Sequence, residues 1–288
     1  MNDSVWTLHT RGKTISFEGT QVMGIVNLTP DSFYDGGWMS TQEQIKEQID
    51  QMVASGASII DVGAESTRPG SDPVSKEEEL KRLTSFFALL SGGKLPSKIL
   101  YSIDTTKAEV AQEALDAGCH IVNSVSGRVD NELLDVSASA EAAYVCMHAQ
   151  GSPKTMQENP QYDDVVKEVE QFTSDFVEKV AQSDATLGSI IADPGFGFGK
   201  RLEDNLKLMN ALPQFVELGH PVMVGVSRKS VIGTLLHGQP AEDRLNGSTV
   251  LHTVACMAGV HILRVHDVKE AAETVRIVTA LREGPSTQ

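Results

Sequence analysis

Short β-branched runs recur along this chain, and nearly every one ends at a polar residue. Runs this short and apolar are typical of strands buried on both faces, and the longer helix-like stretches between them predict parallel crossovers. Eight such units in 288 residues match a single (β/α)8 TIM barrel, a fold that gathers its active site at the carboxyl ends of its strands. The candidate site is therefore the set of polar residues that end the runs: Asn27, Asp61, Asp104, Asn123, His148, Asp193, Ser227 and Arg264.

The order of the runs predicts one α/β domain with a short extension. Residues 1–20 hold two alternating stretches, Trp6 to Leu8 and Thr14 to Phe17, which predict a β-hairpin placed to close the bottom of the barrel, and residues 21–284 form the barrel. Two connections, Leu28 to Ser40 and Gly63 to Val74, are long for a barrel of this size. Long loops in a compact barrel usually carry function, so both are expected to border the site.

Composition excludes several classes of partner. The formal net charge of −15 would repel a phosphate backbone, and no basic face is evident, so no nucleic acid is expected. No apolar run is long enough to cross a bilayer, and Met1 to Thr20 lacks the pattern of a secretory signal, which predicts a cytoplasmic protein without a membrane partner. The three cysteines are far apart and without metal-site spacing, and we expect buried free thiols.

Asp104, Asn123 and Asp193 should converge at the barrel mouth, because each ends a predicted strand. Two acids and an amide suit a flat heterocycle with adjacent N–H groups, although Asp104 alone could equally cap a helix. Asp193 opens the glycine-rich run that ends at Lys200. Its glycine spacing matches neither the dinucleotide fingerprint nor the Walker pattern, so we favour ring binding over phosphate binding and over an ordinary turn.

A second group of residues points to an anion. Ser227-Arg-Lys-Ser follows the seventh run, where two adjacent cations are either a surface pair or partners of an anionic ligand. We favour the ligand, because the loops after strands seven and eight of such barrels often hold phosphate. Arg264 and His266 lie on the same side of the eighth extended segment and would join them. His148 is interpreted as a structural or loop-positioning histidine.

These motifs, in this order, resemble the dihydropteroate synthase family from about Gln21 to the last barrel helix. The resemblance rests on Asn27-Leu-Thr-Pro-Asp-Ser-Phe with Asp35-Gly-Gly, Glu65-Ser-Thr-Arg-Pro-Gly, Asp104-Thr-Thr-Lys, Met147-His with Thr155-Met-Gln, Asp193-Pro-Gly-Phe-Gly-Phe-Gly-Lys, Ser227-Arg-Lys-Ser and Arg264-Val-His-Asp. One departure is Ser124, where the family usually has Asp after the strand-four Asn. We interpret that position as support for its loop, so activity should survive the change.

The resemblance implies a transferase of folate biosynthesis that condenses 6-hydroxymethyl-7,8-dihydropterin diphosphate with p-aminobenzoate to give 7,8-dihydropteroate and pyrophosphate. It also implies a homodimer and Mg²⁺ bound at Asn27. Asp104, Lys229 and Arg264 are the implied catalytic residues. The implied substrate contacts are Asp104, Asn123, Met147, Asp193, Phe198, Lys229 and Arg264 for the pterin, Arg264, His266 and Arg68 for the diphosphate, and Phe33, Thr67, Pro69, Lys229 and Ser230 for p-aminobenzoate.

Three other functions stay open on the residues alone. A lysine such as Lys229 at a strand end could form the Schiff base of an aldolase. A pterin-binding methyltransferase would share the Asp and Asn contacts but would not need the Ser227 or Thr67 motifs. A non-catalytic pterin-binding paralogue is the third, and only Ser124 favours it.

Overall fold

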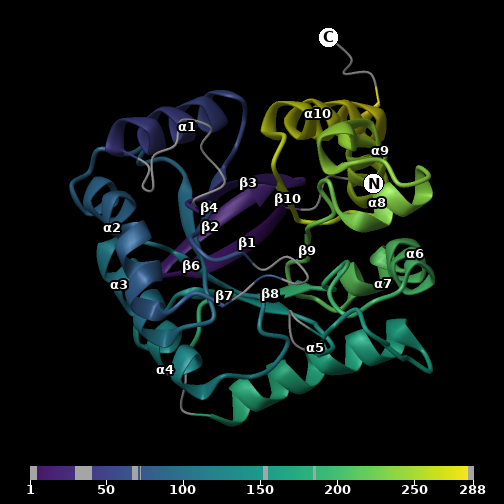
Figure 1. Ribbon diagram of the computed structural model, residues 1–288, viewed down its shortest axis with the longest axis horizontal. Helices are drawn as coiled ribbons and strands as arrows, with labels where there is room; N and C mark the ends of the chain where they lie inside the picture. The colour runs from purple at the N-terminus through teal and green to yellow at the C-terminus, as the bar shows by residue number, and fades with distance from the viewer. Residues whose placement is uncertain are drawn as a thin grey trace.

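The structure is a computed structural model that describes residues 5–29, 41–66, 71, 73–151, 155–183 and 186–284. Its central sheet holds eight parallel strands in the order β8-β7-β6-β5-β4-β3-β10-β9, and a bridge between Ala192 and Val222 brings β8 to β9 and closes the barrel (Figure 1). The strands are β3 (Gln21–Asn27), β4 (Ile59–Gly63), β5 (Leu100–Asp104), β6 (Ile121–Ser124), β7 (Ala143–Met147), β8 (Ile190–Asp193), β9 (Met223–Val224) and β10 (Ile262–Val265). The predicted (β/α)8 barrel is confirmed.

Helices surround the strands on the outside of the barrel (Figure 1). They are α1 (Gln42–Ala54), α2 (Lys76–Ser91), α3 (Ala108–Ala117), α4 (Asn131–Ser139), α5 (Val165–Gln182), α6 (Leu202–Asn210), α7 (Leu212–Glu217), α8 (Ser230–Leu235), α9 (Leu245–Met257) and α10 (Val268–Glu283), with a 3-10 turn at Ala241–Asp243. The helices turn apolar side chains toward the strands. In α1, for example, Ile45 and Ile49 are fully buried one turn apart. The capping box of Thr41 and Gln44 fixes where α1 begins.

The N-terminal segment forms the predicted hairpin, β1 (Val5–Thr10) paired antiparallel with β2 (Lys13–Glu18). Trp6 and Leu8 enter one apolar cluster with inward-facing residues of the barrel strands, namely Met23, Ile59, Leu100, Ile121, Ala143, Val145, Ile191, Met223 and Ile262. His9 makes two hydrogen bonds with Ser189, which directly precedes β8. The Ser189 N–H donates to the His9 carbonyl, and the His9 N–H donates to the Ser189 hydroxyl. The hairpin therefore closes the amino-terminal end of the barrel and leaves the carboxyl-terminal end for the site.

Leu8→Ala is expected to lower the free energy of unfolding by about 3 kcal/mol, because the fully buried side chain would leave a cavity against several strands at once. The matched control is Val5→Ala on the same strand, where the side chain is 63% exposed and the loss should stay within about 0.5 kcal/mol. Urea denaturation of both variants measures the difference. Equal losses would show that the hairpin does not share the barrel core.

The outer surfaces of α9 and α10 carry exposed hydrophobic side chains. Val250, Val254 and Met257 recur at helical spacing on α9, as do Ile277 and Leu281 on α10, and each is at least 40% exposed. The two helices pack side by side (Figure 1). Within the described ranges no helix is both long and apolar enough to cross a membrane.

Candidate active site

The predicted strand-end residues meet at one end of the barrel. Asp104 is the last residue of β5 and pairs in register with Asn123 of β6, while Met147, the last of β7, pairs with Asp193, the last of β8. Asn27 ends β3 opposite Gly63. Parallel strands in continuous register place these side chains around a common mouth.

A buried polar network crosses the mouth. Arg264 of β10 donates from Nε to Asp61 Oδ2 and from Nη2 to Asp104 Oδ2, both at 2.6 Å. Asn123 Nδ2 donates to the same Asp61 oxygen at 2.9 Å. Asp61 is fully buried in the middle of β4, whereas the sequence predicted it at a strand end, and its role as the shared acceptor is not visible in the sequence.

The same network leaves acceptors unused. Oδ1 of Asp61, Oδ1 of Asp104 and Oδ1 of Asn123 are buried and have no hydrogen-bond partner within the described ranges. A buried oxygen without a partner costs free energy, so such atoms mark a place where a ligand donates. Two carboxylates and an amide with free oxygens fit the N–H edge of a heterocycle, but Asp61 stands here in the place of Asp193, which the sequence predicted together with Asp104 and Asn123.

Burial shifts the pKa values of the charged groups at the mouth. It raises the pKa of Asp104 to about 7, with Arg264 acting in the opposite direction and Asp61 adding to the rise, and it also raises the pKa of Asp193. It lowers the pKa of Lys229 to about 8. Burial also acts to lower the pKa of Arg264, but Asp61 and Asp104 outweigh it, so the net shift is upward. The mouth holds the carboxylates of Asp61, Asp104 and Asp193 against the cations of Lys229 and Arg264. This excess of one negative charge favours retention of a proton by the carboxylates.

The glycine-rich loop after β8 joins Asp193 to Lys229. The Gly195 N–H donates to Asp193 Oδ1 at 2.8 Å, and Lys229 Nζ donates to the Phe196 carbonyl at 2.5 Å. Lys229 Nζ also lies 4.5 Å from the centre of the Phe198 ring. The Phe196 ring is buried in the core, so of the two aromatic side chains in the loop it is Phe198 that reaches the mouth.

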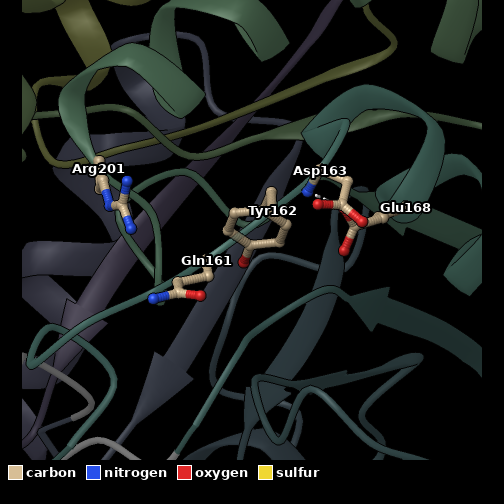
Figure 2. Close-up of a pocket in the computed structure, with 5 residues that line it drawn as sticks. All are labelled: Gln161, Tyr162, Asp163, Glu168 and Arg201. Atoms are coloured by element: carbon tan, nitrogen blue, oxygen red, sulfur yellow. Dashed lines mark hydrogen bonds between the residues drawn. The ribbon is translucent and has the colours of Figure 1, made fainter.

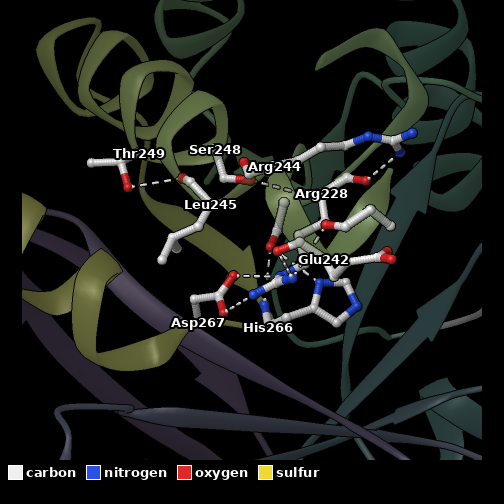
Figure 3. A network of polar contacts seen from close by, with 10 residues as sticks. Arg228, Glu242, Arg244, Leu245, Ser248, Thr249, His266 and Asp267 are labelled. Carbon is white, nitrogen blue, oxygen red and sulfur yellow. Dashed lines mark hydrogen bonds and ion pairs between the residues drawn. The ribbon is translucent and has the colours of Figure 1, made fainter. Parts of the chain in front are cut away.

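The two adjacent cations of Ser227-Arg-Lys-Ser have different partners. Arg228 binds Asp267 with both arms of its guanidinium, Nε to Oδ2 at 2.8 Å and Nη2 to Oδ1 at 2.7 Å (Figure 3). Its backbone has a φ of +57°, and its N–H donates to Ser248 Oγ. A left-handed residue held by this many contacts marks a turn of fixed shape. Arg228 thus joins the loops after β9 and β10 and is not free to bind an anion.

His266 and Ser230 lie close to that turn. His266 contacts the Ser227 hydroxyl through Nδ1 at 3.1 Å and through its backbone N–H at 3.2 Å. Ser230 is the exposed first residue of α8. Both are therefore at the rim. The other expected contacts, Phe33, Thr67, Arg68 and Pro69, lie outside the described residues.

Lys107, which ends the Asp104-Thr-Thr-Lys motif, supports the second long loop. Its Nζ lies 2.5 Å from Glu65 Oε2 and 2.6 Å from Glu79 Oε2, and Glu65 Oε1 accepts the Val74 N–H at 3.1 Å. Glu65 and Val74 are near the two ends of the loop, and Glu79 is fully buried on α2. The sequence shows these charges but not their pairing, because they come from three separate elements.

Lys107→Met is expected to lower the free energy of unfolding by about 3 kcal/mol or more, because it leaves the buried Glu79 carboxylate without a cation. Lys76→Met is the control, since Lys76 forms an ion pair with Glu109 on the open surface and its loss should cause no comparable change. Thermal and urea denaturation of the two variants provide the comparison. Similar stabilities would contradict the role of Lys107.

Ser124 and His148 both contact loops beside the mouth. The Ser124 hydroxyl contacts that of Ser126 at 3.1 Å, and the Ser126 hydroxyl donates to the Arg128 carbonyl at 2.9 Å. Ser124 therefore supports the loop after β6, the role expected from its position. His148 is buried beside Lys200 Nζ at 2.9 Å, a loop-positioning contact that the sequence left open.

Comparison with known proteins gives one consistent result. Residues 23–266 match the model of the family described as pterin binding enzyme. The chain is 41% identical over 273 residues to the dihydropteroate synthase of Escherichia coli, covering 95% of each chain, and 42% identical over 263 residues to that of Synechocystis, covering 91% of this chain and 90% of the relative.

Solved structures agree. The dihydropteroate synthase of Yersinia pestis in a sulfonamide drug complex matches with a TM-score of 0.88 at 38% identity, covering 97% of this chain and 100% of the other. That of Thermus thermophilus in complex with 4-aminobenzoate matches with a TM-score of 0.83 at 41% identity, covering 96% and 100%. The chain belongs to the dihydropteroate synthase family of pterin-binding transferases, which acts in folate biosynthesis.

Proposed function

We propose that this site joins p-aminobenzoate to 6-hydroxymethyl-7,8-dihydropterin diphosphate. The amine nitrogen forms a bond to the exocyclic methylene of the pterin, the C–O bond to the diphosphate breaks, and the nitrogen then releases a proton. The products are 7,8-dihydropteroate and pyrophosphate. The observation that carries the proposal is the buried network of Asp61, Asp104, Asn123 and Arg264 with its three unpartnered oxygens. Of related proteins, that of Thermus thermophilus has been solved in complex with 6HMPPP as well as with 4-aminobenzoate.

The pterin ring would lie between the network and the glycine-rich loop. Asp193 and Asn123 offer acceptors and a donor to its polar edge, and Lys229 offers an ammonium group. Met147 is buried at the end of β7 and Phe198 packs near Lys229, so both give the ring an apolar surface. Residues from three strands would thus hold one flat ligand.

The diphosphate would lie toward Arg264 and His266, with Arg68 of the second loop as a third contact. Asn27 would hold Mg²⁺. Asn27 is the last residue of β3, and its side-chain oxygen is a ligand of the kind that Mg²⁺ accepts. When bound, Mg²⁺ neutralises charge on the diphosphate and makes it a better leaving group.

The p-aminobenzoate would bind at the rim, with Lys229 and Ser230 on one side and Phe33, Thr67 and Pro69 of the two long loops on the other. An aryl amine needs no base to expose its lone pair, so the barrier lies in departure of the diphosphate. Arg264 and His266 receive negative charge as the C–O bond breaks, and ionised Asp104 stabilises the positive charge on the pterin. A dissociative substitution follows, and closure of the loops would exclude water.

Pyrophosphate release tests this proposal. With both substrates and Mg²⁺, pyrophosphate and dihydropteroate should form in equal amounts, and omission of any one component should abolish both. Release of pyrophosphate only in concert with amine attack, judged by isotope exchange, would contradict the dissociative order.

Two further assays test the rival functions. Borohydride with a carbonyl substrate should leave Lys229 unmodified, which would exclude an aldolase. Methyl transfer without pyrophosphate would favour the methyltransferase.

A homodimer is the proposed assembly, formed through α9 and α10. Their exposed side chains make an apolar surface that a second copy of the chain can cover, since a two-fold contact uses the same face of both copies. Met257→Lys combined with Ile277→Lys should shift the protein from dimer to monomer in analytical ultracentrifugation, and Val5→Lys, also exposed but on the hairpin, should not. A dimer that persists in the double variant would exclude this face.

A cytoplasmic location is also proposed. The three cysteines, Cys119, Cys146 and Cys256, are buried free thiols, which are typical of proteins kept in a reducing compartment. When cells are fractionated, the protein should therefore be recovered with the cytoplasmic enzymes. Recovery in the periplasm or the membrane fraction would contradict this location.

A further inference from the structure

Lys200 has a buried ammonium group that the proposed chemistry does not use. The residue ends the glycine-rich loop and is 3% exposed. Its Nζ has four acceptors: His148 Nδ1 at 2.9 Å and the carbonyls of Gly195 at 2.9 Å, Phe198 at 3.1 Å and His148 at 3.2 Å. The three carbonyls carry no charge. The His148 ring is neutral as well, because burial and the neighbouring Lys200 lower its pKa to about 3. A cation without a direct carboxylate partner is costly to bury, and burial accordingly lowers the pKa of Lys200 to about 7. The four acceptors favour its protonated form.

The backbone around this ammonium group is unusually close-packed. Gly195 has a φ of +69°, and a Cβ there would lie 1.8 Å from the His148 carbonyl oxygen. Gly199 has a φ of +61°, and a Cβ there would lie 2.2 Å from the Gln150 carbonyl oxygen. The loop thus lies directly against the backbone that follows β7, with several carbonyl dipoles turned toward one point. Those dipoles repel each other unless a donor with several hydrogens lies between them.

The opposite side of the loop faces a pocket. Tyr162 Oη donates to the Gly199 carbonyl at 2.7 Å, and beside it lies a pocket of about 520 Å³ lined by Gln161, Tyr162, Asp163, Glu168 and Arg201 (Figure 2). Arg201 follows Lys200 in the sequence but lines this outer pocket. Of the two adjacent cations, Lys200 alone reaches the inner face of the loop.

The shape of the loop determines where two pterin-binding groups lie. Gly195 donates to Asp193, and Phe196 and Phe198 contact Lys229 through a carbonyl and a ring. The Gly195 and Phe198 carbonyls that Lys200 binds therefore belong to the same residues that orient Asp193 and Lys229. A change in the loop of a few tenths of an ångström would move both groups relative to the ring.

We propose that Lys200 is a positioning residue for pterin recognition: its ammonium group is an internal cation that holds the Gly195–Gly199 turn so that Asp193 and Lys229 meet the pterin in binding geometry. The inference rests on the proposed function in one respect, the identity of the ligand. Lys200 touches no substrate in this scheme, and its effect passes through the loop. Pterin affinity should therefore depend on it.

The first test compares Lys200→Met with Lys207→Met, a matched change of an exposed lysine on the following helix. The dissociation constant of 6-hydroxymethyl-7,8-dihydropterin diphosphate is measured by calorimetry, and circular dichroism reports folding. Lys200→Met should weaken pterin binding at least tenfold while its circular dichroism spectrum stays that of the unaltered protein. Lys207→Met should change neither. Equal pterin affinity in a folded Lys200→Met variant would overturn the inference.

The second test is chemical rescue, which separates positioning from folding. Lys200→Ala removes the atoms that n-propylammonium can replace, and this amine has the three N–H donors that the carbonyls require. Pterin affinity should recover with n-propylammonium and not with tetramethylammonium, which has the charge but no N–H. If neither cation restores binding, Lys200 has only a structural role and the inference is wrong. If the unaltered protein itself fails to bind the pterin, it is the proposed function that fails.

Discussion

Arg264→Met is expected to lower kcat/KM for dihydropteroate formation about a thousandfold. Arg264 holds Asp61 and Asp104 of the mouth, with a donor 2.6 Å from each carboxylate. It is also the cation that we propose receives the charge of the departing diphosphate. Loss of one preorganised charge contact at a developing anion has an effect of this order. Arg264→Lys keeps the charge but loses the two-armed geometry, so it should recover only part of the rate.

Steady-state kinetics and denaturation of the same variants separate catalysis from stability. Removal of the guanidinium leaves the fully buried Asp61 and its neighbour Asp104 without a cation, which should cost about 3 kcal/mol of unfolding free energy at pH 7. The cost should shrink toward pH 5 as the carboxylates take up protons. Turnover should stay low at both pH values. A variant that regains activity at pH 5 together with its stability would show that Arg264 acts on the fold alone.

The sequence predicts the barrel well because its signal is local. Buried parallel strands appear as short β-branched runs, and the polar residue after each run is placed at the mouth by the topology itself. Asp104, Asn123, Asp193 and Arg264 could therefore be assigned to one site before any coordinates. The seventh strand is the weakest case: the run from Pro221 to Val226 forms only the two-residue strand β9, because the chain leaves the ladder early at Gly225.

Pairings between distant elements could not be predicted in the same way. Asp61 and Arg264 are 203 residues apart, and nothing near either residue shows that they touch. Lys200 and Arg201 are neighbours of the same charge, yet one is buried and the other lines an outer pocket. Arg228 appeared suited to an anionic ligand, whereas its guanidinium binds Asp267. In each case side-chain direction decides, and it depends on the backbone of elements far away in the chain.

The pH dependence of catalysis should follow Asp104. Burial raises its pKa to about 7, so below that value the carboxyl is increasingly protonated and cannot stabilise a positive pterin. We expect kcat/KM to fall about tenfold for each pH unit below 7, and Asp104→Asn to be slower at pH 8 by about a hundredfold or more and to lack this slope. Rate profiles from pH 5 to 9 test both statements.

The same group should affect stability in the opposite direction. An acid whose pKa is raised on folding binds more protons in the native state between its unfolded pKa and about 7, so its contribution to stability falls as pH rises through that window. Activity would therefore rise over the very range in which this contribution to stability declines. Unfolding free energies of the unaltered protein minus those of Asp104→Asn isolate the effect from other titrating groups. A difference that is constant with pH would mean that Asp104 titrates normally, and the pH dependence of the rate would need another source.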